Sequence, residues 1–181
     1  MSDDERPRKA KPRTSAKPRP MTATYLRNSA MHYLSARSAS TTMLRQTLER
    51  RAKTRLCVRQ LSEETRALID KAIGELVTLG MVNDATFAQA RARSLQGKGF
   101  SKRRITEGLR LKGIGGAQAA LAIDPELDEL TQARRFAERK RLGAWRRGGP
   151  TPETRDKDLR ALARAGFAYA IASKALVEAE D

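Results

Sequence analysis

Residues 109–114, with the sequence LRLKGI, are matched further along the chain by residues 162–167, LARAGF. In both stretches a leucine stands four positions before a glycine, a basic residue lies between them, and an apolar residue follows the glycine. Glycine tolerates the left-handed backbone conformation in which many α-helices end. Each stretch therefore predicts the last turn of a basic helix, and their recurrence predicts a fold built from similar helical units.

A second recurrence marks where helices begin. A serine followed by apolar residues four and eight positions later occurs twice, as Ser40, Leu44, Leu48 and as Ser101, Ile105, Leu109. Serine is a favoured N-cap, and residues four apart share one face of a helix. Both triplets therefore indicate the first turns of amphipathic helices, with Ser38 as an alternative cap for the first of them.

The rest of the chain also follows a helical pattern. Proline is absent from residues 21 to 124, apolar residues recur at helical spacing, and no stretch alternates as a strand does. Ser62 and either Asn83 or Asp84 are further N-caps, Gly80 is a helix end, and Pro125 is expected in the first turn of its helix. We expect helices over residues 22–36, 40–53, 63–79, 85–96, 101–112, 116–122, 126–142, 153–165 and 168–178.

These helices fall into three units of three. A single unit of this size cannot bury a full core, so the units should stack into an elongated, curved, all-α array. The expected repeats cover residues 21–82, 83–123 and 124–181. Residues 1–20 hold four of the seven prolines and seven Lys or Arg residues but almost no large apolar side chain, which predicts a disordered basic tail.

The charge of the chain indicates a polyanionic partner. Lys and Arg number 37 against 21 Asp and Glu, which gives a net charge of +16 and a pI near 10.9. Aromatic residues make up only 4% of the chain, too few for a surface that stacks successive bases. Contact with nucleic acid should therefore be mostly to phosphate, although the charge could also serve solubility alone.

Several classes of protein are disfavoured by what the sequence lacks. Cys57 and His32 are the sole cysteine and histidine, so one chain can form neither a disulfide, nor a zinc cluster, nor a Cys/His or His-centred catalytic group. No phosphate-binding glycine loop is present. We expect no enzymatic activity, no catalytic residues, no metal and no cofactor. Without a secretory leader, a long apolar run or a sustained heptad pattern, the expectation is a cytoplasmic monomer that does not bind membranes.

The middle unit concentrates positive charge. Between residues 91 and 112 Glu107 is the sole acidic residue. Arg103 and Arg110 are seven positions apart and share a helix face, and Arg104 lies beside them. We predict that this surface binds a partner or DNA, the alternative being a solubilising face. The candidate binding residues are Arg91, Arg93, Lys98, Lys102, Arg103, Arg104, Arg110 and Lys112.

Two further features allow two interpretations each. The turn at residues 112–117 could aim backbone N–H groups at a phosphate, as in a helix-hairpin-helix module, but the favoured interpretation is a helix end at Gly113 followed by a helix start at Gly115 or Gly116. Trp145 could stack on a base or a partner, but packing within the last unit is favoured.

An ordered series of motifs runs through the middle of the chain: residues 76–84 (LVTLGMVND), 87–88 (FA), 91–93 (RAR), 99–105 (GFSKRRI) and 109–114 (LRLKGI). Together they resemble the RecX regulatory family, and residues 166–169 (GFAY) look like that family's closing segment. The resemblance implies three tandem three-helix repeats. It also implies a protein that binds the RecA filament on DNA and limits recombinase and co-protease activity, affecting recombination, repair and the SOS response.

Two other functions fit the same residues. A stand-alone DNA-binding protein would show phosphate-driven affinity that falls steeply with salt and would be indifferent to the recombinase. A helical scaffold whose charge serves only solubility would bind neither DNA nor the filament.

Overall fold

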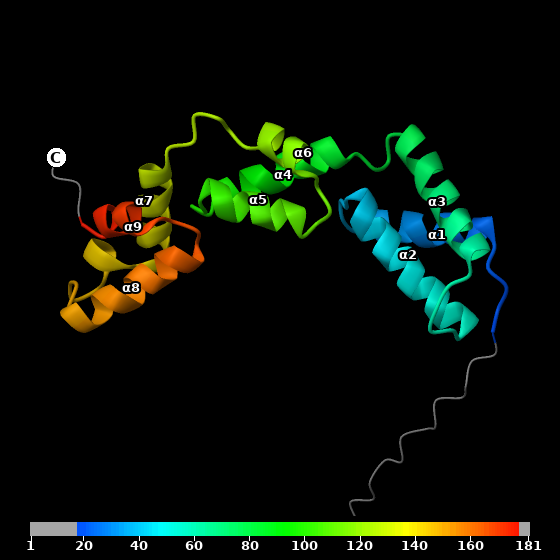
Figure 1. Ribbon diagram of the computed structural model, residues 1–181, viewed down its shortest axis with the longest axis horizontal. Coiled ribbons are helices and arrows are strands. Elements are labelled where there is room, and N and C mark those ends of the chain that lie inside the picture. The colour runs from blue at the N-terminus through cyan, green and yellow to red at the C-terminus, as the bar shows by residue number, and fades with distance from the viewer. Residues whose placement is uncertain (1–17, 178–181) are drawn as a thin grey trace, which may run out of the picture.

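The computed structural model describes residues 18–177, and within that range the chain forms helices and no strands (Figure 1). The predicted all-α class is confirmed. The predicted disordered tail at residues 1–20 lies almost entirely outside the described residues.

Three groups of helices follow one another along the chain, and Figure 1 shows them in a row along the longest axis of the molecule. We call the group α1 to α3 the first repeat, α4 to α6 the second, and α7 to α9 with the short 3-10 helix η1 the third. The elongated array of three-helix repeats is thus confirmed. The helices are α1 (Ala23–Ser35), α2 (Thr41–Leu56), α3 (Glu63–Thr78), α4 (Asp84–Gln96), α5 (Lys102–Arg110), α6 (Gly116–Ala122), α7 (Glu129–Lys140), η1 (Gly143–Trp145), α8 (Pro152–Arg164) and α9 (Tyr169–Ala175).

Each repeat has a small core of its own. Leu26, Leu44, Leu48 and Ile69 are buried at the centre of the first core. The second core is built around Ile105, Leu109 and Ile114. The third is built around Phe136, Leu162 and Phe167. Division of the apolar residues into three clusters explains why the molecule is extended rather than compact.

Helices begin where the sequence places a capping side chain. Ser40 Oγ accepts a hydrogen bond from the backbone N–H of Met43, and Ser101 Oγ accepts one from that of Arg104. Ser62 caps α3 in the same way, and Asn83 rather than Asp84 caps α4. Each cap satisfies a backbone donor that the first turn of a helix leaves unpaired.

Helices end in a recurring motif. The N–H of Ile114 donates to the carbonyl of Leu109 and that of Gly113 donates to the carbonyl of Arg110, which is the double hydrogen bond of a Schellman motif. Gly113 has a φ of +81°. The same pair of bonds closes the ends of α3, α4, α7 and α8 around Gly80, Gly99, Arg141 and Gly166. The stretch that opened the sequence analysis is therefore one form of a stop signal used throughout the chain.

One predicted helix start is wrong. We expected a helix from residue 126 with Pro125 in its first turn, but α7 begins at Glu129. The side chain of Asp124 accepts from the N–H of Glu126, which holds residues 124–127 in a turn. Asp128 then caps α7 by accepting from the N–H of Thr131 at 2.6 Å. Two local carboxylate contacts thus outweigh the preference of proline for a first helical turn.

The far end of the same helix also differs from the prediction. α7 ends at Lys140 rather than residue 142, because Arg141 adopts the left-handed conformation and Leu142 turns back to donate to the carbonyl of Ala137. Over residues 18–177, no helix is long and apolar enough to cross a membrane.

Candidate nucleic-acid and partner interface

The eight predicted binding residues lie on or beside two helices of the second repeat. Arg91 and Arg93 project from α4, and Lys98 follows its end. Lys102 begins α5, Lys112 follows its end, and α5 itself carries Arg103, Arg104 and Arg110. Six of the eight line two open clefts that extend to the third repeat.

The first of these, the central cleft, has a volume of about 490 Å³. Four of the predicted cations line it: Arg91, Lys98, Arg104 and Lys112. Arg139 and Lys140, from the last turn of α7, line its other side. Leu95, Phe100, Gly108 and Leu111 complete the lining, so no acidic side chain is among the residues that form it.

Electrostatics favour an anion in the central cleft. Six cationic side chains around one apolar floor raise the local potential, because low-dielectric walls reduce screening by water. The Nε of Arg91 is buried and has no hydrogen-bond partner within the described part of the chain. A bound anion would supply the acceptor that this donor lacks.

The second, the lateral cleft, lies between α5 and the end of α8. It has a volume of about 630 Å³ and is lined by Arg103, Arg104, Arg110 and Arg164, together with Thr106, Glu107 and Gly166. Arg104 donates to the carboxylate of Glu107 at 2.7 Å, which fixes the arginine that the two clefts share. The lateral cleft is therefore cationic but less uniformly so than the central one.

Two of the eight predicted residues lie outside both clefts. Arg93 is exposed on α4 and lines neither. The ammonium group of Lys102 donates to the carbonyl of Pro125 at 2.7 Å, and its backbone N–H donates to the carboxylate of Glu129 at the same distance. Lys102 thus ties the second repeat to the start of the third.

Three cationic residues of the clefts were not among the predicted binding residues. Arg139, Lys140 and Arg164 come from the third repeat and reach the clefts only because that repeat packs against the second. Arg164 lies within the repeated stretch at residues 162–167. That stretch predicts where its helix ends, but it does not predict which residues of the second repeat lie near Arg164. Arg139 and Lys140 carry no spacing signal that links them to residues 91–112.

The glycine turn at residues 112–117 has a packing explanation. A Cβ on Gly113 would lie 2.1 Å from the hydroxyl oxygen of Thr42, so the turn touches the first repeat directly. Gly115 then occupies the N-cap position of α6. The geometry agrees with the favoured interpretation of a helix end followed by a helix start. Trp145 is likewise half-buried against the core of the third repeat.

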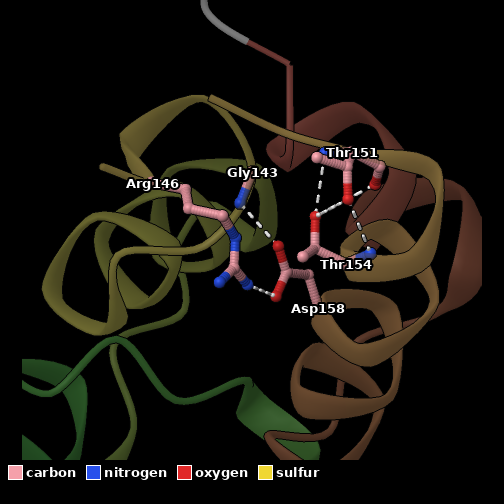
Figure 2. A network of polar contacts seen from close by, with 5 residues as sticks. All are labelled: Gly143, Arg146, Thr151, Thr154 and Asp158. Carbon is pink, nitrogen blue, oxygen red and sulfur yellow. Dashed lines mark hydrogen bonds and ion pairs between the residues drawn. The ribbon is translucent and has the colours of Figure 1, made fainter. Parts of the chain in front are cut away.

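A buried carboxylate in the third repeat serves structure (Figure 2). Asp158 is 2% exposed, and its two oxygens accept from the backbone N–H of Gly143 at 2.8 Å and from the guanidinium of Arg146. The nearby Thr151 and Thr154 form the reciprocal cap of α8. Asp158 therefore anchors the η1 segment to α8. No cluster of potential metal ligands occurs among residues 18–177.

Comparisons with known proteins show which family the chain is similar to. Residues 83–123 match a family model described as the second three-helix domain of RecX. The regulatory protein RecX of Myxococcus xanthus is 37% identical over 175 residues, which cover 94% of each chain. The regulatory protein RecX of Agrobacterium fabrum is 31% identical over 166 residues, covering 87% of this chain and 86% of that one.

Solved structures share the fold. The crystal structure of RecX from Lactobacillus salivarius superposes with a TM-score of 0.61 at 21% identity, over 85% of this chain and 94% of that one. A second crystal structure, of a regulatory protein RecX, gives a TM-score of 0.58 at 20% identity and covers 83% of this chain and 70% of that one.

Proposed function

The chain belongs to the RecX family of regulatory proteins, and from this premise we propose that it binds the RecA filament on DNA and inhibits recombinase and co-protease activity. The protein would then affect recombination, DNA repair and the SOS response. The observation that carries the proposal is the central cleft, where cations of two repeats surround one site without an acidic residue among its lining.

The shape of the molecule supports the same partner. A filament on DNA offers a long helical groove that already holds a polyanion, and an elongated cationic row can follow such a groove over several contacts. The candidate contact residues are the eight predicted cations, extended by Arg139, Lys140 and Arg164. Contacts to DNA would be to phosphate, without sequence preference.

We propose a binding regulator rather than an enzyme, active without a cofactor and as a monomer in the cytoplasm. The buried carboxylate of Asp158 binds the N–H of Gly143 and the guanidinium of Arg146, which supports a structural role for it. The residues gathered in the clefts are arginines and lysines, whose guanidinium and ammonium groups suit recognition of phosphates and carboxylates.

The decisive experiment measures single-strand-dependent ATP hydrolysis by RecA filaments at moderate salt. The purified protein is added at well below one molecule per recombinase subunit, and binding to naked DNA is measured alongside. We expect hydrolysis to fall at ratios too low to coat the DNA. Tight, salt-sensitive DNA binding without any effect on hydrolysis would instead identify a stand-alone DNA-binding protein.

A charge-reversed variant tests the surface. Replacing Arg103→Glu, Arg104→Glu and Arg110→Glu together should abolish inhibition while circular dichroism shows the helix content of the parent. The matched control replaces three exposed cations of the first repeat, Arg50→Glu, Lys53→Glu and Arg59→Glu, which changes the net charge equally. If both variants lose inhibition to the same extent, net charge rather than the clefts controls binding.

A further inference from the structure

The first and second repeats meet at a polar contact that we call the first joint. Ser40, the N-cap of α2, donates its hydroxyl to the carbonyl of Lys112 at the end of α5. The N–H and the hydroxyl of Thr41 both donate to the carboxylate of Asp84 at 2.7 Å. Gly113 lies against the side chain of Thr42.

The second and third repeats meet at a second joint of the same design. Ser101, the N-cap of α5, donates its hydroxyl to the carbonyl of Ala165 at the end of α8, at 3.1 Å. The N–H of Lys102 donates to the carboxylate of Glu129 at 2.7 Å. Gly166 lies against Ser101, where a Cβ would come within 2.1 Å of the hydroxyl oxygen.

Two polar contacts correspond in the two joints. In each joint a capping serine binds the carbonyl that precedes a Schellman glycine, and an acidic first residue of the next repeat binds the N–H of the residue after the serine. The start of α2 thus faces the end of α5, and the start of α5 faces the end of α8, as Figure 1 also shows. Opposite helix ends carry opposite partial charges, so this end-to-end order is electrostatically favourable.

The two joints differ in their apolar support. Phe100 packs against the cores of both the second and the third repeat, and its ring lies 5.7 Å from that of Phe136. The backbone of Gly99 also approaches that of Phe136. At the first joint, no residue of the described chain belongs to both adjoining cores. An open cleft of about 370 Å³ lies there instead, lined by Ser38 and Met43 on one side and by Phe87 and Arg91 on the other.

We propose that the first repeat pivots on the first joint, while the second and third repeats move as one unit. A polar contact can exchange for water at small net cost, whereas separating packed aromatic rings exposes apolar surface. The joint that lacks an aromatic residue shared by both adjoining cores is therefore the one that opens. This inference concerns the fold and does not rest on the proposed function.

The pivot leaves most of the binding surface in place. The residues that line the central and lateral clefts belong to the second and third repeats, and two of their cations, Arg91 and Lys112, also line the cleft at the first joint. The first repeat can then change its orientation relative to the second repeat, while the second and third repeats keep the contact that forms the clefts.

Spin-label distance measurements on the full chain test the proposal. In a Cys57→Ser background, the exposed positions Gln46→Cys and Ala120→Cys span the first joint, and Ala120→Cys with Asp156→Cys spans the second. We expect a broad distance distribution for the first pair and a narrow one for the second. Equal widths, or a broader second distribution, would overturn the proposal.

Two variants separate the polar and apolar contributions. Asp84→Asn should broaden the first distribution by about two-fold while the isosteric Glu129→Gln leaves the second narrow, because Phe100 still holds that joint. Phe100→Leu should broaden the second distribution towards the first. An unchanged second distribution in Phe100→Leu would contradict the assignment of the aromatic pair as the support of that joint.

Discussion

At the scale of single residues, Gly113 satisfies two requirements that happen to coincide. It closes α5 in the left-handed conformation, and it lets the first repeat approach to contact distance. Gly80 meets the first requirement alone, because a Cβ there would have nothing within 4 Å. Comparing substitutions at Gly80 and Gly113 therefore separates the cost of backbone strain from the cost of lost close packing.

We expect Gly113→Ala to destabilise the protein by clearly more than Gly80→Ala. Both substitutions place a Cβ in the left-handed region, which costs about 1–2 kcal/mol. Only the first also drives a methyl group into Thr42. Urea unfolding of both variants measures the difference. Equal losses in the free energy of unfolding would show that the first joint accommodates the added methyl group without cost.

Asp158 supports a second prediction at this scale. Asp158→Ala should cost about 3–5 kcal/mol, because it leaves the charge of Arg146 half-buried without its partner and the N–H of Gly143 without an acceptor. The exposed neighbour Asp156→Ala is the control and should change stability by less than about 0.5 kcal/mol. Thermal unfolding of the two variants makes the comparison.

At the scale of helices, the sequence predicts starts and ends well because capping is local chemistry. Ser40, Ser62 and Ser101 each bind a backbone N–H three residues ahead, which needs no information from the rest of the chain. The predicted start of α7 is wrong because three local signals compete there: the turn at Asp124, the proline at 125 and the cap at Asp128. The spacing of these residues does not indicate which signal is the strongest.

The contact between α1 and α3 leads to a prediction about pH. The hydrogen bond and charge of Arg27 lower the pKa of Glu75 below its ordinary value of 4.5. A carboxylate with a lowered pKa stabilises the fold above its unfolded pKa, and that contribution is lost as the pH falls through its folded pKa. When the pH is lowered from 7 to below 4.5, the free energy of unfolding should therefore fall less in Arg27→Gln than in the parent protein. Chemical unfolding at pH 7 and at acid pH tests this, with Arg66→Gln, whose ion pair lies within α3, as the control.

At the scale of the whole molecule, the row of repeats could be predicted but the clefts could not. The matched stretches at residues 109–114 and 162–167 report that helices end alike, and stacking follows from the small size of each unit. Which cations meet depends on how one repeat sits on the next. Arg139 and Lys140 join Lys98 through that packing alone.

The salt dependence of DNA binding tests the central cleft as a whole. Replacing Lys98, Arg139 and Lys140 by alanine should reduce the slope of log affinity against log salt by about 2 on single strands, since each lost phosphate contact removes about 0.7. The control, Arg50→Ala with Lys53→Ala and Arg59→Ala, should keep the parental slope. A parental slope in the cleft variant would place the phosphate contacts elsewhere.

The two ends of the row are built differently from its joints. Cys57 stands in the left-handed position after α2, where the other two second helices have Gly113 and Gly166, and it carries the Cβ for which those joints leave no room. Pro152 is the first residue of α8, where Thr41 and Lys102 offer an N–H, and proline has none to offer. A head-to-tail contact between copies would generate an open fibre unless it closed on itself. Each end of the row therefore lacks a part that the two joints use, and we expect copies of the chain not to add to one another through this kind of contact.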